Sequence, residues 1–187
     1  MNKTNTLAQK SFVITNQNIL VQGLWIIAFT TLTAIGAQIE IPFHPVPLTL
    51  QTFFVLLAGA ILGKRNGTLS MCLYLLIGVA GLPVFSGWGF GFAKIIGPTG
   101  GYLLSFPIAA FVVGYLHQRQ NNIYWSLISM FVGLFVIFSL GTLHLNIVYY
   151  HDWSKSISNG LLIFSLWDGV KMVAAAVIAS KINKIRI

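Results

Sequence analysis

Long apolar stretches recur along the whole chain and are separated by short polar segments. A helix that crosses a bilayer needs about 20 predominantly apolar residues, and barrel strands would instead alternate apolar and polar positions. The pattern therefore predicts an all-α, polytopic membrane protein with six transmembrane helices. The predicted spans cover residues 19–39, 48–63, 67–86, 98–116, 123–148 and 159–181. The fifth span is long, and the segment "HLNIVYYHDW" is expected to be a partly interfacial turn.

Composition supports a single membrane-embedded unit. Of the 187 residues, 56% are hydrophobic and 7% are charged, whereas soluble domains carry roughly 25% charged residues. We expect one transmembrane domain over residues 1–187, which includes a short polar N-terminal tail over 1–18 without a signal-peptide pattern. Metal and cofactor sites are not expected, because Cys72 is the only cysteine and the four histidines show no ligand spacing.

The distribution of basic residues predicts the orientation in the membrane. Cytoplasmic loops are enriched in Lys and Arg, and this enrichment also explains the net charge of +8 without nucleic acid as a partner. With both termini inside, two basic residues face outward (Lys94 and Lys155), Lys171 lies within a span, and eight face inward: Lys3, Lys10, Lys64, Arg65, Arg119, Lys181, Lys184 and Arg186. We therefore expect a multi-pass protein of a bacterial-type plasma (inner) membrane with cytoplasmic termini.

This orientation places the unusual loops outside. "IPFHPVPLTLQT" carries Pro42, Pro45 and Pro47, and proline makes a segment extended and stiff. "SGWGFGFAKIIGPTGGYL" alternates glycine with aromatic residues, which suits close backbone approach beside flat apolar surfaces. Each loop also has a simpler interpretation, the first as a rigid connector and the second as an interfacial aromatic belt.

Asp168 and Lys171 lie in the last predicted span, and Asp168 is one of only three acidic residues. Residues three apart share a helix face, and Asp168 would lie roughly 13 Å below the outer end of that span. Charges at such depth face a bundle interior or a cavity. They form either a mutually neutralising structural pair or a ligand site in the outer half of the bundle. With amides such as Gln51 and Asn146, such a site suits a small molecule with N–H donors and a carboxylate.

Three stretches carry a resemblance to a known family. "PVPLTLQT…AGLPVF", "GPTGGYL" and "WDGVKMVAAA" occur in the order seen in the BioY family, which this chain resembles over roughly residues 20–183. The family comprises biotin-specific substrate-binding (S) components of energy-coupling-factor (ECF) transporters. The resemblance implies a six-helix S-component bundle, biotin capture from outside, a transmembrane coupling (T) component and two cytoplasmic ATPase subunits.

The resemblance also implies site residues. Asp168 would accept a ureido N–H of biotin, and Lys171 would bind the valerate carboxylate or pair with Asp168. The remaining expected ligand contacts are Thr49, Gln51, Phe85, Trp88, Tyr102 and, less directly, Lys94. The family often carries an Ala-x-x-x-Ala patch on the first helix for docking to the T component. This chain only approximates it with the small residues Thr30/Ala34 and Thr33/Ala37, which still allow close helix packing.

Three other functions are consistent with parts of the pattern. An S component for another vitamin would not bind biotin. A small intramembrane enzyme would need chemistry that three acidic residues and no nucleophile motif hardly support. A purely structural subunit would tolerate removal of the Asp168 and Lys171 charges. The sequence favours a transport subunit that is not an enzyme.

Overall fold

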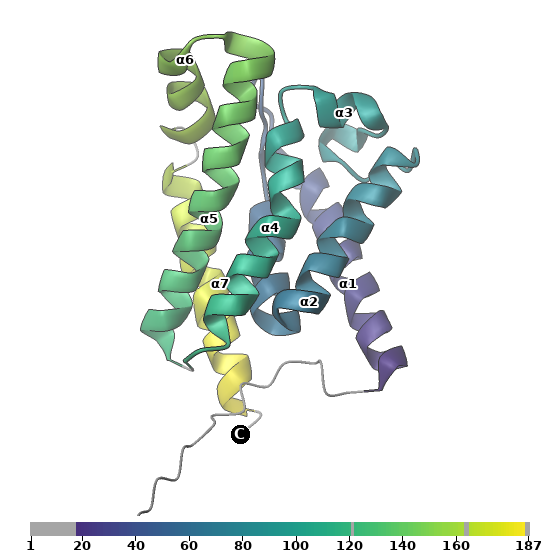
Figure 1. The fold of residues 1–187 in the computed structure, drawn as a ribbon, viewed down its shortest axis with the longest axis vertical. Helices are drawn as coiled ribbons and strands as arrows, with labels where there is room; N and C mark the ends of the chain where they lie inside the picture. Colours follow the sequence, from purple (N-terminus) through teal and green to yellow (C-terminus); the bar gives the residue numbers. More distant parts are fainter. Residues whose placement is uncertain (1–17, 121, 163–164, 186–187) are drawn as a thin grey trace, which may run out of the picture.

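The computed structural model describes residues 18–120, 122–162 and 165–185. Its helices run roughly along one axis, with α3 and α6 at one end and the C-terminal end of α7 at the other (Figure 1). We call the end that carries α3 and α6 the loop end. Of the predicted tail over 1–18, all but Asn18 lies outside the described residues, as do Lys3, Lys10 and Arg186.

Among the described residues, five long helices form the bundle and short elements lie between them. The long helices are α1 (Ile19–Gln38), α2 (Gln51–Val79), α4 (Gly100–His117), α5 (Ile123–Leu145) and α7 (Ser165–Ile185). Two short helices, α3 (Phe92–Ile96) and α6 (Trp153–Ile157), accompany the single turn Ser86–Trp88 and the π-helical turns Asn146–Tyr150 and Ser158–Leu162. Helix α2 packs against α4 and α1, α4 against α5, and α7 against both α5 and α2.

Helix α2 is broken at Gly63, whose φ of 79° and ψ of 174° lie outside the helical region. The chain folds back at this point, so that residues on either side of Gly63 lie close together. A Cβ added to Gly67, for example, would lie 2.8 Å from the Ala58 carbonyl oxygen. Positive φ is accessible to glycine at little cost, so Gly63 permits the reversal. The break separates the stretches expected as the second and third spans, although the second arm ends at Val79, short of residue 86.

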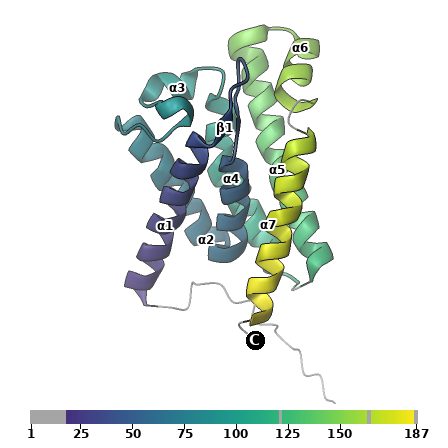
Figure 2. The same cartoon turned by 180° about the vertical axis from the view of Figure 1, so that it is seen from behind.

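The three prolines of the first unusual loop, Pro42, Pro45 and Pro47, lie between two short strands. Strands β1 (Glu40–Ile41) and β2 (Leu48–Thr49) form a two-stranded antiparallel hairpin in which Glu40 pairs with Thr49. Figure 2 shows this hairpin at the loop end, between α1 and the helices α5 and α7. Leu48 and Thr49 therefore belong to a strand and not to the predicted span over 48–63.

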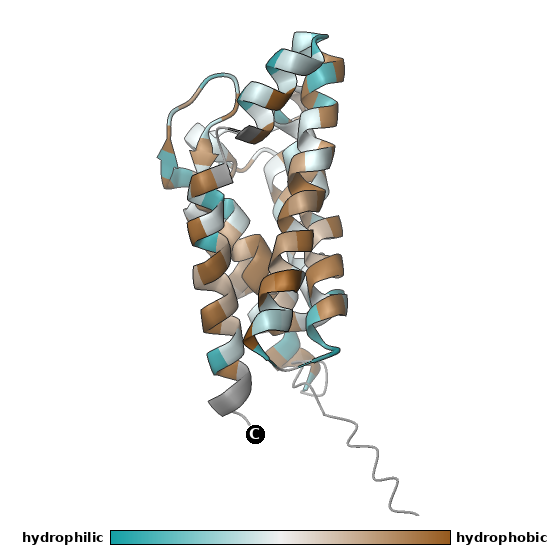
Figure 3. Cartoon of the chain, turned by 90° about the vertical axis from the view of Figure 1, so that its left-hand side faces the viewer, coloured by the Kyte–Doolittle hydropathy of each residue, from teal (hydrophilic) through white to brown (hydrophobic). Residues whose placement is uncertain are grey.

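Within the described residues, three helices are long and apolar enough to cross a membrane: Ile19–Gln38, Gly100–His117 and Ile123–Tyr150. A fourth is reached if Trp153–Leu161 and Leu166–Ile182 are one broken span. Both arms of α2 are shorter than the roughly 20 residues that a straight crossing requires. In Figure 3 apolar residues cover the middle of the helices, and hydrophilic residues gather toward the two ends.

The last predicted span is not one continuous helix. Its described parts, Trp153–Leu161 and Leu166–Ile182, are bent by 45° relative to each other, and the turn Ser158–Leu162 is π-helical. Asp168 therefore lies in the first turn of α7 and not nine residues inside an unbroken helix. A carboxylate in a first helical turn is favoured by the helix dipole.

Candidate functional site

The buried ion pair between Asp168 and Lys171 forms the centre of the site. Lys171 Nζ lies 2.6 Å from Asp168 Oδ1, and the two side chains are 5% and 1% exposed. Lys171 Nζ also donates to the Thr49 carbonyl oxygen at 2.7 Å and to Thr52 Oγ1 at 2.8 Å. The three N–H groups of the ammonium thus match three acceptors, which offsets much of the cost of burying the charge.

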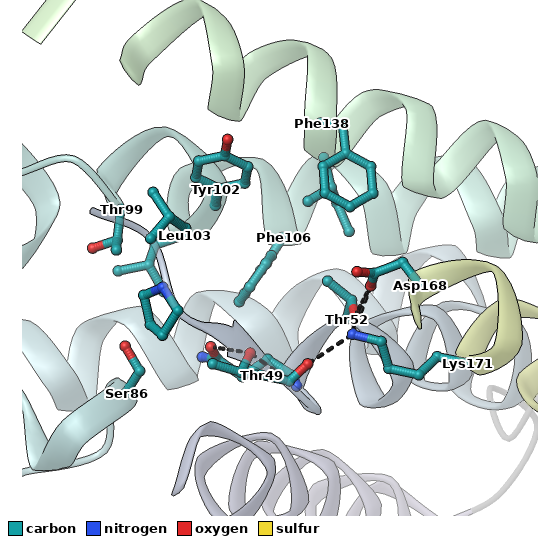
Figure 4. Close-up of a pocket in the computed structure, with 14 residues that line it drawn as sticks. Thr49, Thr52, Ser86, Thr99, Tyr102, Leu103, Phe106, Phe138, Asp168 and Lys171 are labelled. Carbon is teal, nitrogen blue, oxygen red and sulfur yellow. Dashed lines mark hydrogen bonds and ion pairs between the residues drawn. The ribbon is translucent and has the colours of Figure 1, made fainter. Parts of the chain in front are cut away.

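Thr52 connects the two charged groups. Its hydroxyl accepts from Lys171 and donates to Asp168 Oδ1 at 2.6 Å. The strand residue Thr49 and the helix residue Thr52 stand on either side of the start of α2, so the hairpin and α2 both hold α7 at this point. Figure 4 shows Asp168 and Lys171 approaching Thr52 from the α7 side.

One carboxylate oxygen of Asp168 is left without a partner. Asp168 Oδ2 is buried and makes no hydrogen bond within the part of the chain that the structure describes. A buried acceptor without a donor costs about 1–3 kcal/mol, and more when it is charged. The site therefore offers an acceptor and no free donor on Lys171, which is the arrangement that a ligand N–H group would complete.

Gln51 belongs to a second network beside the ion pair. Thr49 Oγ1 donates to Gln51 Oε1 at 2.8 Å, and Gln51 Nε2 donates to the Tyr74 hydroxyl at 2.6 Å. Tyr74 in turn donates to the Val84 carbonyl oxygen at 3.0 Å. This chain of bonds fixes the Gln51 amide and ties the start of α2 to the segment after α2.

A polar cavity of about 40 Å³ adjoins these groups. Figure 4 shows Tyr102, Leu103, Phe106 and Phe138 on one side of it and Thr49 and Thr52 on the other. The Tyr102 hydroxyl donates to the Gly160 carbonyl oxygen at 2.8 Å. The cavity is lined by Val46, Pro47, Thr49, Gln51, Thr52, Ser86, Thr99, Tyr102, Leu103, Phe106, Ile137, Phe138, Asp168 and Lys171.

The structure brings five of the eight expected ligand residues together: Thr49, Gln51, Tyr102, Asp168 and Lys171 line the cavity. Three others do not line it. Phe85 is buried against Tyr74, with ring centroids 5.5 Å apart, and Trp88 is 68% exposed. Lys94 Nζ lies 3.4 Å from the Ser86 carbonyl oxygen. Asn146, also considered from the sequence, accepts from Ser156 instead.

The small residues expected to dock a partner lie mainly inside the chain. Thr30, Thr33 and Ala37 are buried, and Thr30 Oγ1 donates to the Ser70 carbonyl oxygen at 2.9 Å. These residues pack α1 against α2. Ala34 alone of the four is partly exposed, so a partner contact through this set has little surface to use in the described arrangement.

Sequence inspection missed Thr52, Phe106 and Phe138 as lining residues. Thr52 directly follows Gln51 in the quoted loop motif, and that adjacency was the available signal. The two phenylalanines lie in largely apolar helices, where nothing in the sequence distinguishes a cavity wall from a lipid-facing position. Within the described residues there is no cluster of three or more Cys, His, Asp or Glu side chains that could hold a metal.

Comparisons of the sequence and of the structure with known proteins point to the same family. The chain is 45% identical over 159 residues to a biotin transporter BioY of Thermotoga maritima, covering 85% of this chain and 94% of the relative. It is 41% identical to a probable biotin transporter BioY of Pyrococcus horikoshii, covering 83% and 91%. A solved S-component for biotin from an ECF-type ABC transporter superposes with a TM-score of 0.81 at 28% identity, covering 88% and 92%. The BioY family model matches residues 6–186, and the chain belongs to the BioY family.

Proposed function

We propose that this protein is a biotin-binding S component that captures biotin and passes it inward as a subunit of an ECF transporter. The observation that carries the proposal is the unpartnered Asp168 Oδ2 at a buried cavity, in a chain whose relatives are named biotin transporters. The protein binds and delivers its ligand without transforming it, as expected for a transport family.

The polar group of biotin fits the acceptor at Asp168. A ureido N–H donates to Asp168 Oδ2, which would otherwise remain buried without a donor. Lys171 acts chiefly as the partner of Asp168, because its three contacts already use the ammonium N–H groups. Of the two roles considered for Lys171, the contacts favour pairing with Asp168 over binding the valerate carboxylate.

Ligand entry requires the site to open. A cavity of about 40 Å³ is much smaller than the roughly 300 Å³ at which small-molecule pockets begin. Val46, Pro47 and Thr49 of the hairpin segment line the cavity on one side and Ser86 lines it from the third-loop region. We propose that these two loops move apart to admit biotin and close again over it. Phe85, Trp88 and Lys94 would then influence binding through the position of the second loop, which contains them.

The membrane arrangement follows the distribution of charge. We propose one transmembrane domain over 1–187 with six spans, in which the two arms of α2 serve as short second and third spans joined at Gly63. Both termini lie on the cytoplasmic side, because the inner segments then carry the excess of Lys and Arg. The loop end then lies on the outer side of a bacterial-type inner membrane, which is the side from which the protein would capture biotin.

A binding subunit without a nucleotide-binding motif needs partners to drive uptake. We propose a T component and two cytoplasmic ATPase subunits as those partners. Helix α1 contacts the T component through the side that does not pack on α2, where Ala34 reaches the surface and Thr30, Thr33 and Ala37 support the helix from within.

Equilibrium binding of biotin to the purified protein in nanodiscs tests the proposal. We expect saturable binding below micromolar ligand, with no competition by an unrelated vitamin. A protein that is monodisperse yet fails to bind biotin at micromolar concentration contradicts the proposed function. Binding of a different vitamin in that experiment identifies an S component of another specificity and also rejects biotin.

A further inference from the structure

Three side chains form a basic cluster at the end of the bundle opposite the loop end, where α2 is broken and α4 ends (Figure 1). Lys64 Nζ lies 5.6 Å from the centroid of the Tyr115 ring, and Arg119 Cζ lies 4.6 Å from the same centroid. The Arg119 guanidinium also donates to the Tyr115 hydroxyl. Cations are attracted to the face of an aromatic ring, so Tyr115 holds two positive charges together that would otherwise repel each other.

The packing of α2 on α4 places the cluster. Gly114 directly precedes Tyr115 in α4, and a Cβ at Gly114 would collide with the backbone N of Lys64. The turn at Gly63 can therefore approach α4 closely, which brings Lys64 beside Tyr115. The position of Lys64 is thus set by backbone contacts between two long helices.

No acidic side chain of the protein is placed to neutralise this cluster. The chain has three acidic residues: Glu40 lies in β1 and Asp152 precedes α6, both at the loop end, and Asp168 is paired with Lys171. The side chains of the basic cluster are exposed. The cluster is therefore open to an anion from outside the chain.

The neighbouring surface of α4 indicates what kind of anion fits. Leu104, Ile108, Phe111 and Tyr115 are exposed, and their spacing places them on one face of the helix; we call them the α4 stripe. The rings of Phe111 and Tyr115 are stacked, with centroids 6.3 Å apart and planes 3° apart. The stripe is roughly 17 Å long at 1.5 Å per residue, close to half of the roughly 30 Å hydrocarbon core of a bilayer.

We propose that the basic cluster and the α4 stripe bind one anionic phospholipid, with its phosphate at Lys64 and Arg119 and an acyl chain along the stripe. Basic residues near a membrane surface attract anionic lipids in general, and the structure adds a fixed pair of cations that ends an apolar stripe of one leaflet's depth. An acidic protein segment would use the cations and leave the stripe uncovered. The site goes beyond the proposed function, because none of its residues lines the polar cavity.

Native mass spectrometry of the purified protein, titrated with lipid in detergent, tests the site. We expect one molecule of phosphatidylglycerol to bind about fivefold more tightly than phosphatidylcholine with the same acyl chains. Lys64→Gln and Arg119→Gln should each weaken phosphatidylglycerol binding about fivefold. The matched control is Lys181→Gln, which removes an exposed lysine from the same end of the bundle and should leave the affinity unchanged. Equal losses in Lys64→Gln and Lys181→Gln would overturn the proposal, since they would indicate attraction by net charge alone.

Two variants of the ring test the site at constant charge. Tyr115→Leu keeps an apolar side chain but removes the cation–π contacts, so it should weaken phosphatidylglycerol binding about threefold, whereas Tyr115→Phe should bind nearly as well as wild type. Unchanged affinity in Tyr115→Leu would overturn the proposal. Biotin affinity should stay within about twofold of wild type in both variants, which also shows that they fold, because Tyr115 does not line the polar cavity.

Soluble anions separate a lipid site from its alternatives. Glycerol 3-phosphate carries the phosphate without acyl chains, and hexaglutamate represents an acidic protein segment. Neither should displace bound phosphatidylglycerol at millimolar concentration, because neither covers the α4 stripe. Displacement by glycerol 3-phosphate would assign the cluster to a free phosphate, and displacement by hexaglutamate would assign it to an acidic partner; either result would overturn the proposal.

Discussion

The chain contains two Asp-x-x-Lys sequences, "DWSK" at 152–155 and "DGVK" at 168–171. One forms an exposed ion pair and the other a buried one. In the first, Lys155 Nζ lies 3.8 Å from Asp152 Oδ2, and the side chains are 66% and 41% exposed. In the second, the ion pair is 2.6 Å long and almost fully buried. The same spacing thus gives a solvated surface pair in α6 and a buried pair in α7.

Their remaining contacts explain the different roles. Asp152 caps α6 by accepting from the backbone N–H groups of Ser154 and Lys155, so these hydrogen bonds stay within the start of α6. Asp168 instead contacts Thr52 of α2 and keeps one oxygen unpartnered at a cavity. Exposed ion pairs contribute about 0–1 kcal/mol, whereas removing one partner of a buried pair costs about 3–5 kcal/mol. Burial and an incomplete hydrogen-bond set distinguish the candidate ligand site from the helix cap.

The largest effect is expected from the buried pair. Asp168→Asn and Lys171→Met should each weaken biotin binding by at least tenfold, or about 1.4 kcal/mol. Lys171→Met should also destabilise the protein by about 3–5 kcal/mol, because it leaves a buried carboxylate without its cation. Titration calorimetry in nanodiscs and thermal unfolding measure the two effects. Unchanged affinity in both variants would reduce the pair to a structural role.

The next largest effect is expected at the hydroxyl that joins the two charges. Thr52→Val keeps the shape of the side chain but removes the bond to Asp168 Oδ1 at 2.6 Å. A hydrogen bond to a charged group contributes about 1.5–3 kcal/mol, so we expect roughly tenfold weaker binding or more. Thr52→Ser is the control and should bind nearly as well as wild type. Equal loss in the Ser and Val variants would indicate that the methyl group matters and not the hydroxyl.

A smaller effect on stability, with none on binding, is expected at the exposed pair. Asp152→Asn keeps a capping oxygen, whereas Asp152→Ala removes it and should cost the α6 N-terminus about 1 kcal/mol. Biotin affinity should stay within about twofold of wild type in both variants and in Lys155→Met. Hydrogen exchange of the α6 amides and biotin titration measure the two quantities. A large loss of affinity in Lys155→Met would mean that this surface pair takes part in capture.

The smallest effect is expected at Lys94. Its ammonium contacts the Ser86 carbonyl oxygen at 3.4 Å and does not line the polar cavity. Lys94→Met should therefore keep biotin affinity within about twofold, since the substitution removes one long hydrogen bond within the loop and no group that lines the cavity. The measurement is a biotin titration at two salt concentrations. A strong, salt-dependent loss of affinity would place the ligand carboxylate near Lys94 instead.

The helical architecture could be predicted because a helix in a membrane needs a long apolar run, and such runs are visible in the sequence. Gly63 and the proline-rich loop are local backbone signals, so the reversal in α2 and the extended hairpin were also foreseeable. The boundaries of the last span were not, because a π-helical turn such as Ser158–Leu162 has no reliable sequence signal. The burial of Thr30, Thr33 and Ala37 likewise depends on which face of α1 meets α2.

The sequence by itself determined that the chain is an apolar helical bundle with a charged pair in its last helix and with the motifs of its family. It already placed the pair at 168–171 inside a span and Lys155 outside, but it could not decide which groups complete the hydrogen bonds of the buried pair. The tertiary structure decided this, because only the packing of α7 on α2 brings Thr52 and Thr49 to Lys171. That packing completes the hydrogen bonds of the cation and leaves one oxygen of Asp168 without a donor within the described residues, which is the acceptor that the proposed function assigns to the ligand.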